Sequence, residues 1–149
     1  MAFELMNAHK FEIQTGTDAT TQEPIYSLIA KGITNVEPNN NEELDQTKYL
    51  DGDGYGETDV TAAQLVLTFT GHRYYGDPAQ DYIVGKLLEL GPTRRTNFRW
   101  TEPDGGIFEG PCTIANISGP SGDAGTKGEI SFEIHFNGRP QYTPPTTGA

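Results

Sequence analysis

One segment of the chain has the periodicity of a helix, and it follows a strand pattern within residues 64–91. Leu65, Leu67 and Phe69 alternate with the residues between them, which predicts a strand with one apolar face. The rest of the chain shows the short alternating runs and turn residues of strands and loops. The helix must therefore pack against a β core, and this requirement limits the chain to a mainly β fold of the α+β class.

The helix is predicted from Asp77 to Leu90, with a start and a stop signal. Asp77 can cap the first turn, Pro78 has no amide hydrogen to lose there, and Gln80 can complete a capping box. The apolar face at helical spacing consists of Ala79, Tyr82, Ile83, Leu87 and Leu90. The Gly-Pro pair after Leu90 ends the helix.

Strands are predicted at residues 9–15, 25–31, 64–70, 93–101, 107–118 and 129–137. The last is the clearest, because Ile130, Phe132, Ile134 and Phe136 alternate with polar residues. With 18 Gly, 10 Pro and 34% hydrophobic residues in 149, the composition favours many turns. We therefore predict one domain, residues 1–149, built as an antiparallel β-sandwich or barrel flanked by one α-helix.

Residues 35–59 interrupt the strand pattern and hold eight acidic residues against Lys48 alone, a charge of −7 out of −11 for the chain. We predict a long acidic loop here. It is either a solvated loop or an assembly arm that becomes ordered against another subunit. Tyr49, Leu50 and Tyr55 favour the arm, because a loop that serves only solubility has no need of them.

The segment Asp51-Gly-Asp53 resembles the start of a calcium-binding loop. Tyr55 stands where the fifth position of that loop requires Asp or Asn, and Ala62 stands at the twelfth position in place of the bidentate Glu. We therefore prefer a Gly-Asp turn and predict no metal site.

Three of the ten basic residues, Arg94, Arg95 and Arg99, lie close together in the sequence. We expect them to pair with acidic residues of a neighbouring subunit or to lie on a solvated sheet face. The net charge of −11 argues against binding to a nucleic-acid backbone, since phosphate contacts require Lys and Arg.

Catalytic patterns are weak, so no enzyme and no cofactor is predicted. The histidines His9, His72 and His135 lack ligand spacing and a neighbouring nucleophile, and no serine lies in a nucleophile elbow. Cys112 is the single cysteine, which excludes an intrachain disulfide and indicates a small apolar core residue.

No signal peptide or membrane anchor is predicted, and we expect a soluble chain made in the cytoplasm of its host. The last residues, 138–149, contain Pro144-Pro145 and are predicted to form an extended C-terminal tail outside the core.

Two long runs resemble the major tail (tail tube) protein of long-tailed, non-contractile bacteriophages and related prophages. They are TKYLDGDGYGETDVTAAQLVLTFTGHRYYGDPAQDYIVGKLLEL and PDGGIFEGPCTIANISGPSGDAGTKGEISFEIHFNGRP, within residues 47–140. The resemblance implies a β-sandwich flanked by one helix, and a virion protein that forms hexameric rings stacked into a tube. It also implies that residues 35–59 bridge subunits and rings and that residues 138–149 form a further arm.

The resemblance further implies a homo-oligomer, with the tape-measure protein and tail-end proteins as partners and genomic DNA passing through without specific binding. The resemblance and the charge pattern together predict that residues of the acidic loop and of the basic cluster lie at subunit interfaces. They are Glu42, Glu43, Asp45, Tyr49, Leu50, Asp51, Asp53, Tyr55, Arg94, Arg95 and Arg99. The alternative is a monomeric carbohydrate- or calcium-binding β-sandwich module, in which Trp100, Tyr74 and Tyr75 would form a sugar platform.

Overall fold

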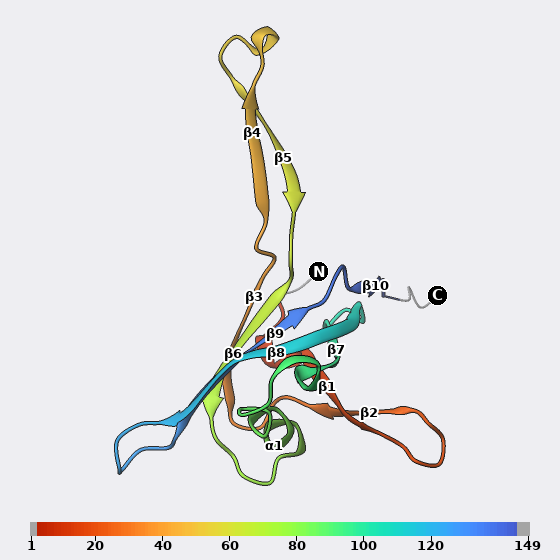
Figure 1. Ribbon diagram of the computed structural model, residues 1–149, viewed down its shortest axis with the longest axis vertical. Helices are drawn as coiled ribbons and strands as arrows, with labels where there is room; N and C mark the ends of the chain where they lie inside the picture. The colour runs from red at the N-terminus through yellow and green to blue at the C-terminus, as the bar shows by residue number, and fades with distance from the viewer. Residues whose placement is uncertain (1–2, 146–149) are drawn as a thin grey trace.

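The computed structural model describes residues 3–145 and contains a large antiparallel sheet, a projecting hairpin and one α-helix (Figure 1). The strands are β1 (Lys10–Thr17), β2 (Pro24–Leu28), β3 (Ile33–Asn39), β4 (Glu43–Lys48), β5 (Gly56–Ala62), β6 (Val66–His72), β7 (Arg95–Thr101), β8 (Ile107–Ser121), β9 (Glu129–Phe136) and β10 (Gln141–Thr143). The helix is α1 (Pro78–Val84), and the 3-10 turns are η1 (Met6–Ala8), η2 (Leu50–Gly52) and η3 (Gly91–Arg94). The predicted mainly β, α+β class is confirmed.

The large sheet has the strand order β2-β1-β7-β8-β9-β6-β3, and all its pairings are antiparallel. Strand β8 is long enough to serve two partners along one side. Its start, Ile107–Glu109, pairs with β10, and its later part pairs with β9 from Cys112 onward. Strands β2 and β3 are the edges of this sheet.

The sheet curls, so that its first strands pack against its last. The ring of Phe11 on β1 lies 5.4 Å from that of Phe69 on β6, edge to face. Phe69 also stacks on Phe132 of β9 at 5.0 Å and meets Phe98 of β7 at 6.0 Å. The aromatic residues thus join both halves of the sheet in one core, and such pairs add about 0.5–1.5 kcal/mol beyond their buried area.

The predicted inward faces of the two clearest strands are confirmed. Leu67 and Phe69 on β6 are fully buried, whereas Leu65, on the same predicted face, lies before the strand and is half-buried. On β9 the alternating apolar residues are buried, as the sequence predicts: Ile130, Phe132, Ile134 and Phe136. Cys112 is buried in the same core, as predicted for a small apolar residue.

Helix α1 starts where the sequence predicts, but it is shorter. The carboxylate of Asp77 accepts a hydrogen bond of 3.1 Å from the amide of Gln80, which caps the first turn. The helix ends at Val84, where Gly85 forms the C-cap, and does not reach Leu90. Leu87 and Leu90, predicted on the buried face, are 43% and 84% exposed, because the chain leaves the helix before they would face the core.

The prediction of a loop at residues 35–59 is wrong, because this segment is largely strand. It contains most of β3, all of β4 and η2, and the first part of β5. Strands β4 and β5 pair from Glu43 to Lys48 and continue the β3–β6 pair outward (Figure 1). We call residues 40–63 the arm.

The predicted C-terminal tail, residues 138–149, is also partly structured. Strand β10 pairs with β8, and the ring of Tyr142 lies 4.7 Å from that of Phe108. Phe108 in turn stacks on Trp100 at 4.9 Å, so this segment adds to the aromatic packing of the sheet. Residues 146–149 lie outside the described part of the chain.

Candidate assembly surfaces

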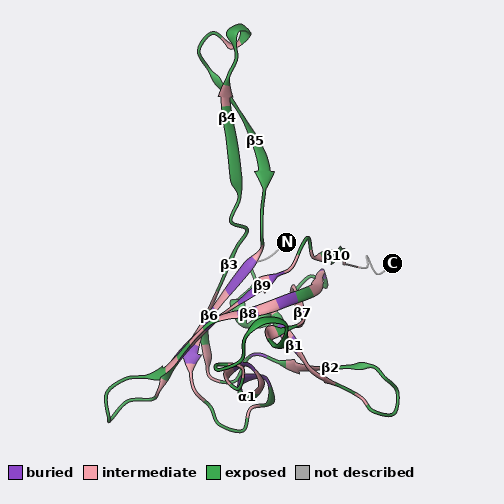
Figure 2. Ribbon diagram, viewed as in Figure 1, coloured by how far each residue is buried: buried purple, intermediate pink, exposed green. Residues whose placement is uncertain are grey.

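The arm consists almost entirely of exposed side chains. Every residue of β5 is exposed, and Thr47 is the one half-buried residue of β4 (Figure 2). A two-stranded hairpin is marginally stable in water when nothing covers it. The arm therefore draws no stability from a hydrophobic core of its own.

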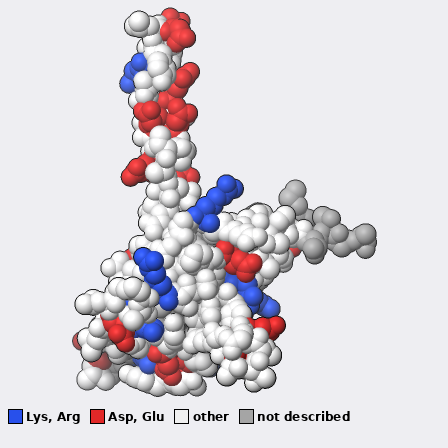
Figure 3. Space-filling view, turned by 45° about the vertical axis from the view of Figure 1, so that its right-hand side comes forward, with Lys and Arg blue, Asp and Glu red and all other residues white. Residues whose placement is uncertain are grey.

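The two faces of the arm differ in charge. Asp45 lies directly opposite Asp59, and Thr47 lies opposite Glu57 on the same face. The other face pairs Leu44 with Val60. Acidic side chains accordingly line the arm in the space-filling view (Figure 3). Like charges in directly opposite positions destabilise a strand pair, so the Asp45–Asp59 pair disfavours the isolated hairpin.

The tip of the arm presents Leu50 and Tyr55 to solvent, with exposed fractions of 105% and 81%. The turn is fixed by two backbone hydrogen bonds, from the Gly52 amide to the Tyr49 carbonyl (3.1 Å) and from the Tyr55 amide to the Gly52 carbonyl (3.0 Å). Asp53 adopts a left-handed conformation with φ of 55°. A defined turn thus holds apolar side chains away from the body of the protein.

All eight predicted interface residues between Glu42 and Tyr55 lie on the arm and are exposed: Glu42, Glu43, Asp45, Tyr49, Leu50, Asp51, Asp53 and Tyr55. The calcium-like turn, Asp51 to Asp53, falls at the tip. Within residues 3–145, no three His, Cys, Asp or Glu side chains come together as a metal site would require.

The predicted basic cluster is divided among different contacts. Arg94 donates hydrogen bonds of 2.9 Å to the carbonyl oxygens of Glu89 and Leu87. Arg99 forms an ion pair of 3.2 Å with Glu12, and this hydrogen bond raises the pKa of the guanidinium further. Arg95 is the exposed member of the three. The structure therefore uses Arg94 and Arg99 within the subunit and leaves Arg95 on the surface.

The residues of the alternative sugar platform are used in separate interactions. The Trp100 indole donates to Nδ1 of His9 at 3.1 Å and stacks on Phe108. The Arg73 guanidinium lies 4.3 Å from the Tyr75 ring centroid, and the Lys31 ammonium lies 4.8 Å from that of Tyr74.

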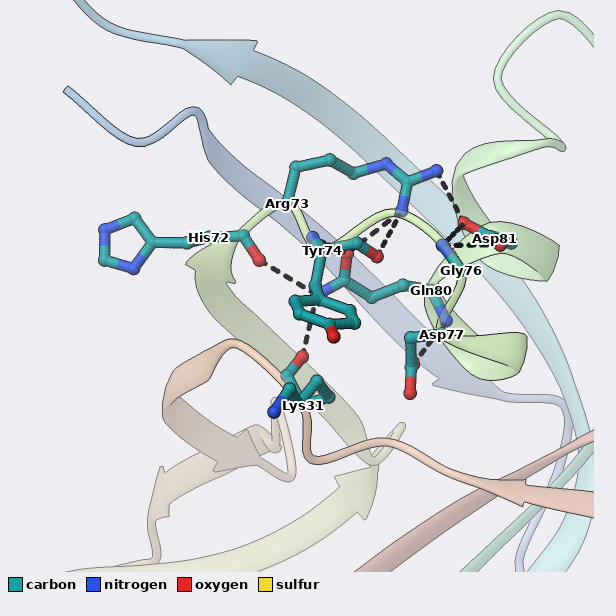
Figure 4. Close-up of polar contacts among 8 residues, drawn as sticks. All are labelled: Lys31, His72, Arg73, Tyr74, Gly76, Asp77, Gln80 and Asp81. Carbon is teal, nitrogen blue, oxygen red and sulfur yellow. Dashed lines mark hydrogen bonds and ion pairs between the residues drawn. The ribbon is translucent and has the colours of Figure 1, made fainter. Parts of the chain in front are cut away.

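Helix α1 lies at the end of the body opposite the arm (Figure 1), and its buried Gln80 makes the contacts drawn in Figure 4. Nε2 of Gln80 donates to the carbonyl oxygens of Lys31 (2.8 Å) and His72 (2.9 Å). Its Oε1 accepts hydrogen bonds from the amide of Tyr74 (2.9 Å) and from Nη1 of Arg73 (3.2 Å). The capping-box role predicted for the Gln80 side chain is thus wrong, because all four contacts serve other segments.

This network anchors both strands that lead into the arm. His72 ends β6, and Lys31 lies in the turn before β3. Arg73 also forms an ion pair of 2.8 Å with Asp81 on α1, which holds the turn after β6 to the helix. The sequence shows Gln80 beside Ala79 on the inner face of a helix, and this placement is the one signal of its buried role.

A hollow of about 480 Å³ lies between the N-terminal segment and the edge strand β3. Its lining comes from residues 5–11 and from the turn and strand at residues 29–36. The lining residues are Leu5, Met6, Asn7, His9, Phe11, Ile29, Ala30, Ile33, Thr34, Asn35 and Val36. The sequence carries no signal for this hollow, because it forms only when the sheet curls and brings β1 near β3.

No helix within residues 3–145 has the length and apolar character needed to span a membrane.

No protein-family model and no curated protein sequence matches the chain. Solved structures do. A chain in the tail of an empty GTA particle, determined with C6 symmetry, aligns with a TM-score of 0.72 at 17% identity, over 95% of this chain and 100% of that one. A chain in the virion of a native gene transfer agent (GTA) particle aligns with a TM-score of 0.71 at 16% identity, over 95% of this chain and 100% of that one.

A chain of an extracellular contractile injection system, from the sheath–tube complex in the extended state, aligns with a TM-score of 0.51 at 12% identity, over 91% of this chain and 87% of that one. At these identities the likeness concerns the fold. The chain therefore shares its fold with chains of a GTA tail, a GTA virion and a sheath–tube complex.

Proposed function

We propose that the chain is a structural virion protein that forms hexameric rings, which stack into a non-contractile phage tail tube. The arm is the observation that carries this proposal. It is a projecting hairpin with exposed apolar residues at its tip and two aspartates opposed across its strands. A monomer gains no core from such an element, whereas a polymer gains a contact between copies.

The fold supports the same proposal. The tail chain with which this protein aligns over 95% of its length belongs to an assembly of C6 symmetry. A cyclic ring uses heterologous contacts, in which one surface of a subunit meets a different surface of the next. The arm and the body of this subunit are two such different surfaces, and the free edges of β2 and β3 are two others.

The charge suits a conduit for DNA. The chain carries a net charge of −11, and Lys and Arg number only ten. A lumen that neutralised phosphates would retain the duplex, whereas an acidic one lets it pass. The proposed partners are other copies of the chain, the tape-measure protein and the tail-end proteins, in a tail made in the host cytoplasm.

The test is the assembly state of the purified protein. We expect sedimentation velocity to show large species as concentration rises, and negative-stain micrographs to show rings with six-fold class averages or stacked tubes. A chain that remains monomeric at every concentration, with and without the tail-end proteins of its own virion, would refute the proposal.

A further inference from the structure

The hollow of about 480 Å³ beside β3 is a concave site on the described part of the chain. We propose that it receives the tip of the arm of a second copy, with Leu50 as the inserted side chain. This inference rests on the proposed function and identifies the surface that the arm contacts.

The lining of the hollow suits an apolar side chain flanked by carboxylates. Its apolar part comes from Leu5, Met6, Phe11, Ile29, Ala30, Ile33 and Val36. None of the lining residues is acidic, although the whole chain has 21 Asp and Glu. The polar lining residues are Asn7, His9, Thr34 and Asn35. The amides of Asn7 and Asn35 and the imidazole of His9 can donate hydrogen bonds, whereas the Thr34 hydroxyl already donates to the Thr70 carbonyl oxygen at 3.1 Å.

The tip of the arm has the complementary chemistry. Leu50 is fully exposed, and the carboxylates of Asp51 and Asp53 lie within three residues of it on the same turn. The backbone hydrogen bonds that close the turn hold Leu50 in place before any contact forms, which reduces the entropy lost on docking. Transfer of the Leu50 side chain from water into an apolar site is favourable, because it removes apolar surface from water.

The occupant must be the tip of another copy. Val36 in the hollow and Tyr49 at the tip are thirteen positions apart in mostly extended chain, which spans roughly 40 Å at about 3.3 Å per residue. The arm projects away from the body, so the tip does not fold back onto its own hollow (Figure 1). When the tip of each copy enters the hollow of the next in one direction, the contact is heterologous and its repetition generates a ring or a filament.

Disulfide cross-linking between two variants tests this contact. Leu50→Cys and Met6→Cys are prepared separately, one of them with a terminal tag that separates the mixed dimer by size. They are mixed under assembly conditions, oxidised, and run on a non-reducing gel. We expect the mixed dimer as the main product. Leu88→Cys, at an apolar position 92% exposed on the turn after α1, replaces Met6→Cys as the matched control and should give no such product.

A second pair of variants tests the energetics. Leu50→Asp should abolish assembly while its thermal melt matches wild type, because Leu50 contributes nothing to the core. Leu88→Asp should assemble normally. Tubes from Leu50→Asp, or cross-linking of Leu50→Cys to Leu88→Cys in place of Met6→Cys, would overturn the docking site and leave the tube function standing. A wild-type chain that forms neither rings nor tubes would refute both.

Discussion

The Gln80 side chain donates a hydrogen bond of 2.8 Å to the carbonyl oxygen of Lys31, 49 residues away in sequence. Gln80 is 1% exposed, so Gln80→Ala leaves carbonyl and amide groups of the neighbouring segments without a partner. An unsatisfied buried polar group costs about 1–3 kcal/mol. We expect the urea midpoint of Gln80→Ala to fall accordingly. Gln46→Ala on the exposed arm is the control and should unfold like wild type; equal midpoints for both variants would contradict the anchoring role.

Removal of the arm separates folding from assembly. The Gln64 amide donates a hydrogen bond of 2.9 Å to the Asn40 carbonyl oxygen, so the two strands are close together at the base of the arm. Residues 41–63 can therefore be replaced by a two-residue Asn-Gly turn between Asn40 and Gln64. The shortened chain keeps its core and should melt as wild type does, but it should form no stacked tubes in electron micrographs. Tubes of normal length would show that the arm is dispensable. A lost melting transition would show that the arm contributes to the fold.

The local sequence predicts those elements in which buried and exposed residues alternate regularly along the chain. Strand β9 was predicted with its inward face because four apolar residues alternate with polar ones. The arm has the same backbone geometry, yet it was predicted as a loop, because solvent surrounds both of its faces and leaves no hydrophobic alternation. For Leu87 and Leu90 the prediction is wrong in the opposite sense, because a regular pattern is present where no helix forms. They extend the helical spacing of α1, but Gly85 ends the helix before they could be buried.

Of the two proposed contact surfaces, the sequence predicts the tip of the arm but not the hollow. Tyr49, Leu50 and Tyr55 were identified because apolar residues inside an acidic segment have no local explanation. The hollow requires contacts between residues 5–11 and 29–36, which follow from the curl of the sheet. The Arg99 contact also depends on a residue distant in the sequence, because Glu12 lies opposite Arg99 across the β1–β7 pair.

Phe132→Ala tests the aromatic core. Phe132 is 1% exposed and stacks on Phe69 at 5.0 Å, so truncation leaves a cavity between β9 and β6. We expect a loss of about 3–5 kcal/mol of unfolding free energy, measured by denaturant titration. Phe3→Ala is the matched control, because Phe3 is 105% exposed and should change the stability little. A Phe132→Ala protein as stable as wild type would exclude this residue from the core.

The hydrogen bonds of the Glu133 carboxylate predict that the stability of the fold depends on pH. Its carboxylate accepts hydrogen bonds from Asn116 (2.9 Å) and from Nε2 of His135 (2.8 Å), and these two contacts, that of Asn116 first, lower the pKa of Glu133 below its ordinary value of 4.5. A folded pKa below the unfolded one means that ionisation stabilises the fold. The contribution is complete above the unfolded pKa and is lost as pH falls through the folded pKa.

Glu133→Gln should therefore be less stable than wild type at neutral pH, and the difference should shrink as the solution is acidified below the unfolded pKa. Thermal melts of both proteins across this range measure it. Glu129→Gln, at an exposed position on the same strand, is the control and should give no comparable difference at neutral pH. A gap between Glu133→Gln and wild type that is constant with pH would contradict ionisation as its cause.

The burial of Cys112 predicts that its thiol reacts only after the protein unfolds. Burial raises its pKa to about 12, and the side chain is fully enclosed by the core. The thiolate is the reactive form, so a disulfide reagent at neutral pH meets a thiol that is both protonated and inaccessible. We expect no labelling of the native protein and complete labelling in concentrated guanidinium. Labelling of the native chain at the rate of an exposed thiol would show that the interface of β7, β8 and β9 opens readily. Slow labelling would instead follow the global opening of the core, because Cys112 is exposed only when these central strands separate.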